Sequence, residues 1–307
     1  MLNLQRTLNR PINFSGIGLH SGTIANVSIK PQEQNTGIVF VRTDLKENNV
    51  ILANYQNVSA STLCTTISNS KKNSVSTVEH LLAALYITGV DNALIEINNI
   101  EVPIMDGSSL DFVELINKVG TKEQKSERKV LSVNQKHKLK IDNKFISIEP
   151  NNDGLVVDFK LNYKNPTIGS QRNIIDFSKD DLKDVYSSRT FCLYEDIEKI
   201  KKLGFAKGGS LKNAVVVQDY KVLNEGGLRN KLEFVNHKIL DLAGDFLLSG
   251  FRINGKITSI EGGHNLSINF LSKMFNEISI ERESLIDRVK STKTVIQKLP
   301  SQIAVNS

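Results

Sequence analysis

An alternation of apolar and polar residues near the N-terminus predicts β-strands. Ala25, Val27 and Ile29 are apolar at every second position, and residues 37–41 continue with β-branched and aromatic side chains. The turn sequence Asn-Asn-Asp-Gly over residues 151–154 predicts a hairpin between two later strands. The strands expected in the rest of the chain cover residues 92–97, 139–148, 155–163, 214–217 and 256–260.

Helical spacing of apolar residues first occurs over residues 76–88. Ser76 and Glu79 are placed as a capping box, and Gly89 follows as a C-cap. Each half of the chain thus combines antiparallel-looking strands with about two helices, which predicts an α+β fold rather than a regular βαβ alternation. The other expected helices cover residues 110–119, 194–203, 232–248 and 265–277.

A polar stretch near the middle of the chain predicts a linker. The apolar pattern lapses over residues 120–129, and 307 residues exceed what one hydrophobic core usually organises. We therefore expect an N-terminal α+β domain over residues 1–122, a C-terminal α+β domain over residues 130–280 and a loosely held tail over residues 281–307. The sequence shows no internal repeat.

The composition is that of an ordinary globular protein with a basic balance. The net charge of +6 favours anionic partners, which makes a nucleic-acid-binding α+β protein one hypothesis. We expect no nucleic-acid partner, because Trp is absent and no basic–aromatic motif occurs. Two distant cysteines, a polar start and aspartates inside the most apolar window predict a cytoplasmic protein with no integral membrane segment.

The ionisable residues His237, Lys238, Asp241 and Asp245 interrupt the long apolar helix predicted over residues 232–248. His237, Asp241 and Asp245 are spaced by four and form one stripe on a helix face. The ordinary interpretation is a surface stripe with a weak His–Asp pair. The alternative is a metal site, because an imidazole and a carboxylate at this spacing converge on one ion and a third ligand would complete a catalytic tripod.

Two further histidines lie at predicted helix starts. His80 follows Glu79 but belongs to no HExxH motif, and taken alone it fits a hydrogen-bonded core histidine better than a ligand. His264 follows Gly262 and Gly263, and glycines there permit the backbone to approach a ligand closely. A turn followed by a surface histidine explains the same residues.

Several motifs in register extend this pattern over nearly the whole chain. They are Gly16–Gly22 (GIGLHSG), Ser76–Leu85 (STVEHLLAAL), Pro103–Ser108 (PIMDGS), Arg189–Phe191 (RTF), His237–Asp245 (HKILDLAGD) and Gly262–His264 (GGH). Together they resemble the UDP-3-O-acyl-N-acetylglucosamine deacetylase family of lipid A biosynthesis. The similarity ends at about residue 278 and leaves the tail uncovered.

The resemblance implies a fold and a reaction. The fold is two α+β domains that face each other, each with a sheet packed on helices and a small insert. The reaction is zinc-dependent hydrolysis of the N-acetyl group of UDP-3-O-acyl-N-acetylglucosamine, which releases acetate and is the committed step of lipid A biosynthesis. A different zinc amidohydrolase is the alternative, although the motifs of zinc peptidases and nucleoside deaminases are missing.

The resemblance also assigns residues to roles. Zn²⁺ would be held by His80, His237 and Asp241. Catalysis would depend on Glu79 as general base, His264 as general acid, Asp245 as the residue that orients it and Thr190 as a contact of the tetrahedral oxyanion. The acylated UDP-amino-sugar would contact Lys238, Phe191 and Lys144. The insert over residues 190–217 would shape a hydrophobic passage for the acyl chain. The sequence does not set the acyl length, the native metal or the oligomeric state, and we expect a monomer.

Overall fold

Two sheets with the same strand connectivity form the framework of the computed structural model, which describes residues 3–279. The tail expected over residues 281–307 lies outside the described residues. The first sheet has the order β2 (Ile12–Ile17), β3 (Ile24–Pro31), β9 (Ala93–Ile97), β4 (Ile38–Arg42) and β5 (Val50–Leu52). The second has the order β12 (His137–Ile141), β13 (Lys144–Glu149), β19 (Arg252–Ile260), β14 (Leu155–Asn162) and β15 (Ser170–Asp176). A short strand, β11 (Val130–Ser132), also pairs with β19.

The two sheets repeat one pattern that the sequence does not reveal. In each, a late strand enters the middle: β9 pairs antiparallel with β3 and parallel with β4, and β19 pairs antiparallel with β13 and parallel with β14. The hairpin expected around residues 151–154 is therefore wrong, because β19 separates β13 from β14. The stretch expected as one strand over residues 139–148 is itself a hairpin of β12 and β13.

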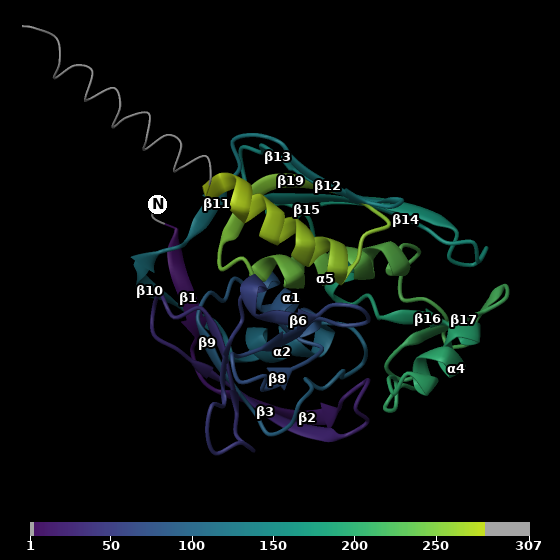
Figure 1. The fold of residues 1–307 in the computed structure, drawn as a ribbon, viewed down its shortest axis with the longest axis horizontal. Coiled ribbons are helices and arrows are strands. Elements are labelled where there is room, and N and C mark those ends of the chain that lie inside the picture. Colours follow the sequence, from purple (N-terminus) through teal and green to yellow (C-terminus); the bar gives the residue numbers. More distant parts are fainter. Residues whose placement is uncertain (1–2, 280–307) are drawn as a thin grey trace, which may run out of the picture.

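Helices fill the layer between the two sheets, as Figure 1 shows, and the α+β prediction is confirmed. They are α1 (Glu79–Ile87), α2 (Leu110–Val119), α5 (Glu233–Leu247) and a helix that begins at residue 264 and is described to residue 279. The helices α1 and α5 cross at the centre. A Cβ on Gly244 of α5 would lie 2.1 Å from the carbonyl oxygen of Glu79, so only glycine permits this approach.

The sequence predicted the C-terminal end of α1 correctly but not its N-terminal end. The C-terminal prediction is confirmed: Gly89 has φ +75°, and the amides of Gly89 and Val90 donate to the carbonyls of Tyr86 and Leu85. The capping box is wrong, because Ser76 donates to the carbonyl of Ile100 at 3.1 Å and the helix begins only at Glu79.

The predicted linker is a strand. Residues 121–127 form β10 (Thr121–Glu127), which pairs antiparallel with β1 (Leu4–Leu8). Its side chains are polar and largely exposed, so backbone pairing and not an apolar face holds it in place. Within residues 3–279, no helix has the length and apolar character needed to cross a membrane.

Each half also carries a small insert between its hairpins and its central helix. The first contains η1 (Tyr55–Asn57), β6 (Val58–Ala60), β7 (Thr66–Ser68) and β8 (Ser74–Val75). The second contains α3 (Lys183–Tyr186), β16 (Phe191–Leu193), α4 (Tyr194–Lys202), β17 (Val215–Gln218) and β18 (Lys221–Val222). The part of the second insert from β16 to β18 protrudes from the side of the molecule in Figure 1.

Candidate metal centre and active site

Three buried side chains from the crossing helices converge on one point. His80 comes from the first turn of α1, and His237 and Asp241 lie one turn apart on α5. Asp241 Oδ1 is 3.5 Å from His80 Nε2 and 3.4 Å from His237 Nε2, and the three candidate ligand atoms lie within 4.8 Å of one another. Ligands about 2.0–2.1 Å from a tetrahedral zinc are about 3.3 Å apart, so the cluster has the dimensions of a metal site.

The polar atoms of this cluster also fit a metal ion. Asp241 Oδ1 is buried and has no hydrogen-bond partner among the residues that the structure describes. His237 Nδ1 lies 3.0 Å from the Ser188 carbonyl, an arrangement that places the proton on Nδ1 and leaves the Nε2 lone pair facing the cluster. Burial lowers the pKa of His237 to about 3, which keeps the ring in the neutral form that metals bind.

A carboxylate and an imidazole flank the cluster without belonging to it. Glu79 Oε2 accepts a hydrogen bond from the Thr65 amide at 3.0 Å, and Glu79 Oε1 is 3.7 Å from His264 Nε2. Burial raises the pKa of the Glu79 carboxyl, although the charges of His264 and His80 oppose the shift. Such a carboxylate is a stronger base than one in water.

A buried aspartate fixes the orientation of His264. Asp245 Oδ2 lies 2.9 Å from His264 Nδ1, and the Thr65 hydroxyl donates to Asp245 Oδ1 at 2.7 Å. Burial alone would lower the pKa of His264, but the carboxylates of Asp245, Asp241 and Glu79 outweigh it and raise the pKa to about 10. The imidazole is therefore held as a proton donor whose Nε2 faces the cluster.

Thr65 contacts both flanking groups, and the sequence did not indicate it. Its amide binds Glu79 and its hydroxyl binds Asp245, so one residue of the first insert positions both flanking groups. A threonine in the polar stretch Cys-Thr-Thr carries no spacing signal that would single it out. The Ser188 carbonyl that orients His237 was missed for the same reason, since a backbone acceptor has no sequence signature.

Lys238 and Phe191, the expected substrate contacts, lie beside the cluster. Lys238 Nζ donates to Asp241 Oδ2 at 2.9 Å and lies 5.4 Å from the centre of the Phe191 ring. Burial would lower the pKa of Lys238, but Asp241 outweighs it and raises the pKa, so the ammonium stays charged. Lys144 is different: it is exposed at the start of β13 and takes no part in the contacts that hold the cluster.

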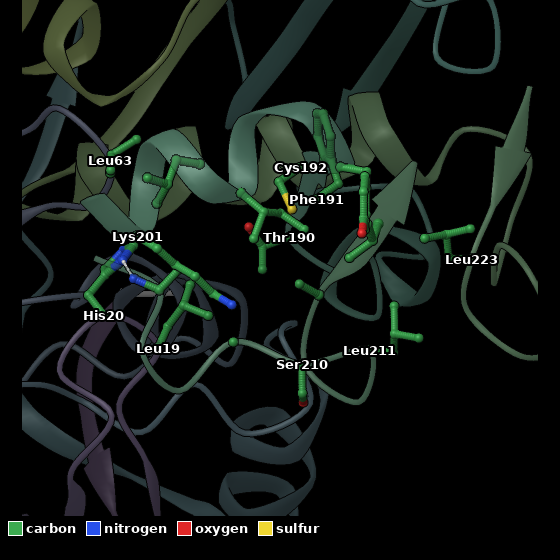
Figure 2. A pocket seen from close by; sticks show the side chains of 17 residues that line it. Leu19, His20, Leu63, Thr190, Phe191, Cys192, Lys201, Ser210, Leu211 and Leu223 are labelled. Carbon is green, nitrogen blue, oxygen red and sulfur yellow. Dashed lines mark hydrogen bonds between the residues drawn. The ribbon is translucent and has the colours of Figure 1, made fainter. Parts of the chain in front are cut away.

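Thr190 lines a largely apolar cavity of about 330 Å³, and the next residue, Phe191, lines it too and lies 6.3 Å from the His237 ring, centre to centre. The Thr190 amide donates to the Gly107 carbonyl at 2.7 Å, and its carbonyl accepts from Val215 at 2.7 Å. The second insert forms most of the cavity wall, and Leu19, His20 and Leu63 of the first half complete it. Figure 2 shows Leu19 and His20 on the side away from Leu211 and Leu223.

A buried ion pair holds the segment that carries Thr190. Arg189 donates to both carboxylate oxygens of Glu233, at 2.7 and 3.1 Å, and its amide donates to the same group. Glu233 begins α5, the helix of the two candidate ligands. The Arg-Thr-Phe motif therefore connects the cavity to this helix.

A buried nitrogen–nitrogen–oxygen ligand set, with one carboxylate and one imidazole beside it, is the constellation of a metal-dependent hydrolase. Comparison with known proteins narrows this class. Residues 5–276 match the model of the LpxC family, described as UDP-3-O-acyl N-acetylglycosamine deacetylase. The chain therefore belongs to this family.

Two relatives illustrate the similarity. The UDP-3-O-acyl-N-acetylglucosamine deacetylase of Haemophilus ducreyi is 39% identical over 270 residues, which cover 87% of this chain and 88% of that protein. The protein of the same name from Shewanella oneidensis is 39% identical over 289 residues, covering 91% of this chain and 94% of that protein. The likeness thus spans both sheets and the site between them.

Proposed function

We propose that this protein is a zinc-dependent deacetylase that hydrolyses the N-acetyl group of UDP-3-O-acyl-N-acetylglucosamine in lipid A biosynthesis. The products would be acetate and UDP-3-O-acyl-glucosamine. The observation that carries the proposal is the buried cluster of His80, His237 and Asp241, with Glu79 and His264 beside it and an apolar cavity adjoining it. Family membership supports the same substrate.

The three candidate ligands suit zinc, which binds imidazole nitrogen and carboxylate oxygen in catalytic sites with an open fourth position. When bound, zinc polarises the amide carbonyl and lowers the pKa of water toward about 7. Lys238 donates a hydrogen bond to Asp241 Oδ2. The other carboxylate oxygen, Oδ1, faces the two imidazoles.

Glu79 and His264 divide the proton transfers. Glu79 takes a proton from water as the water oxygen bonds to the acetyl carbon, and the Thr190 hydroxyl contacts the tetrahedral oxyanion. As the C–N bond breaks, His264 donates its Nε2 proton to the departing amine. Asp245 holds Nδ1 throughout and keeps Nε2 facing the reacting atoms. Each transfer typically accelerates a reaction by about 10²–10⁴-fold.

The apolar cavity supports a substrate that carries an acyl chain. Its wall consists mainly of apolar side chains such as Leu211, Val216 and Leu223, and it begins at Thr190 and Phe191 beside the cluster. An acyl chain in this cavity gains about 0.8 kcal/mol for each CH₂ that leaves water. Phe191, Lys238 and Lys144 are the proposed contacts of the sugar nucleotide, and a cytoplasmic monomer is the proposed form of the enzyme.

Acetate release tests the proposal. Purified protein should release acetate from UDP-3-O-acyl-N-acetylglucosamine, lose this activity with a chelator and regain it when zinc is added. Glu79→Gln, which removes the base but no ligand, is the matched inactive control. Acetate release that persists after complete metal removal would contradict the proposal, as would turnover of acetylated peptides in place of the sugar nucleotide.

A further inference from the structure

Glu101 is a buried carboxylate outside the candidate active site, and three neutral groups donate to it. Its side chain accepts from the His20 amide at 2.8 Å, the Ser21 amide at 2.6 Å and the Thr77 hydroxyl at 2.8 Å. The residue is 1% exposed, and no Lys, Arg or His within the described part of the chain forms an ion pair with it. Burying an unpaired carboxylate is costly, so these three hydrogen bonds have to compensate for its lost hydration.

Two of those donors belong to a loop that wraps tightly over the carboxylate. A Cβ on Gly18 would lie 2.4 Å from Glu101 Oε2 and 2.4 Å from Ser21 Oγ, so the loop follows this path only with glycine there. The loop amides point inward to Glu101, and its side chains at positions 19 and 20 point toward the apolar cavity.

The same loop contacts the second insert across the cavity wall. The amides of Lys207 and Gly208 donate to the carbonyls of His20 and Leu19, at 3.3 and 3.0 Å, and a Cβ on Gly208 would lie 2.3 Å from the carbonyl oxygen of Gly18. Leu19 and His20 therefore form, together with Leu63, the wall that the first half contributes to the cavity, as Figure 2 shows. Glu101 holds that wall through the backbone amides of the loop, on the side away from the cavity.

The third donor connects Glu101 to the catalytic helix. Thr77 has φ +55°, a left-handed conformation that is strained for a β-branched residue, and its hydroxyl is held by Glu101. Two residues later Glu79 begins α1, followed by His80. A single carboxylate thus anchors both the cavity wall and the backbone that leads into the candidate catalytic residues.

We propose that Glu101 is a positioning residue that determines acyl-chain specificity. It does so because it fixes the position of the Leu19–His20 wall of the cavity relative to the start of α1. The proposal rests on the proposed deacetylase function. Loss of the anchor releases the wall, so a long acyl chain loses its packing surface while a short one loses much less. The backbone before Glu79 also relaxes, which lowers turnover of both substrates.

Glu101→Gln tests this, because glutamine keeps the shape of the side chain but replaces one accepting oxygen by an NH₂ group. That group cannot accept from the His20, Ser21 or Thr77 donors. Acetate release is measured with a long-chain 3-O-acyl substrate and with the 3-O-acetyl analogue, alongside melting temperature and zinc content. Gly18→Ala disturbs the same anchor from the loop side, and it decides the test if Glu101→Gln does not fold. Glu96→Gln is the matched control, because Glu96 pairs with Lys30 away from the cavity.

We expect the ratio of kcat/KM for the long-chain substrate to kcat/KM for the short-chain substrate to fall about tenfold in Glu101→Gln and in Gly18→Ala. A tenfold change corresponds to the free energy of about one hydrogen bond to a charged acceptor. The ratio should stay unchanged in Glu96→Gln. A variant that merely unfolds loses both activities by the same factor, and an unchanged ratio would overturn the proposal. Absence of acetate release by the wild-type protein would instead overturn the proposed function, and this inference with it.

Discussion

Replacing Asp245 by asparagine removes the charge that faces His264 without changing the size of the side chain. Asp245 Oδ2 lies 2.9 Å from His264 Nδ1, and Thr65 donates to the other oxygen. Asparagine keeps an acceptor for Thr65 but presents an amide NH₂ to His264 Nδ1. The imidazole then has to accept at Nδ1, which favours the neutral ring over the imidazolium that donates a proton.

The size of the effect follows from the charges around His264. Its pKa is raised to about 10 by Asp245, Asp241 and Glu79 against burial, and Asp245 makes the largest of the three contributions. Removing a carboxylate in direct contact lowers a pKa by about 1–3 units. A divalent cation beside Asp241 would repel the imidazolium and lower its pKa. With zinc bound, the basic limb of the wild-type pH profile therefore lies below pH 10. General acid catalysis requires the protonated ring, so activity falls as pH rises through this pKa.

The assay is kcat/KM for acetate release as a function of pH. In Asp245→Asn we expect the basic limb to move about 1–3 units toward lower pH and the maximum to fall by about 10²–10⁴-fold. Zinc content should stay stoichiometric because Asp245 is not a proposed ligand. Asp158→Asn is the control, since it breaks an ion pair between Asp158 of β14 and the exposed Arg172 of β15, away from the cluster, and should leave the pH profile unchanged. A basic limb that stays at the wild-type pH would refute this role of Asp245.

Three further perturbations test the rest of the site. His237→Ala should lose both metal and activity, and elemental analysis that finds full zinc occupancy would reject the ligand assignment. Glu79→Ala should keep stoichiometric zinc and lose turnover by about 10²-fold or more; wild-type turnover with only a lower melting temperature would make the carboxylate structural. Arg189→Ala leaves Glu233 buried without its cation and should lower the free energy of unfolding by about 3–5 kcal/mol, measured by denaturant titration.

Local patterns predicted the helices better than the pairing of strands. The helix over residues 110–119 was predicted with its observed bounds, because apolar spacing and the glycine that follows it are both local signals. The hairpin around residues 151–154 was wrong because β19, about a hundred residues later in the chain, inserts between its two strands. The strand β10 was taken for a linker because its side chains are polar, although its backbone pairs with β1.

The candidate site shows the same division between local and distant signals. Spacing by four placed His237 and Asp241 on one face of a helix, and the structure brings them together. No spacing rule could connect His80 or His264 to that pair, because His80 lies on α1 and His264 begins the last described helix. Their positions at predicted helix starts made both histidines candidates, and the resemblance to a family gave them roles. The roles of these residues, and the division into domains near residues 122–130, stay predictions.

The capping box failed for a physical reason that concerns the site. Glu79 has the spacing of a capping residue with Ser76, but its carboxylate accepts from Thr65 and faces His264. The left-handed backbone at Thr77 turns the chain so that Ser76 pairs elsewhere. A local rule thus gave way where the chain has to present a side chain to a distant partner, as is common at functional sites.

The crossing of α1 and α5 has a thermodynamic consequence. His80 belongs to the half built on the first sheet, and His237 and Asp241 belong to the half built on the second. An ion bound by all three joins the halves as a noncovalent tether, and its binding free energy adds to the stability of the native state by mass action. Thermal unfolding should therefore shift upward with free zinc concentration. A chelator would act on the protein twice, by removing activity and by loosening the junction between its halves.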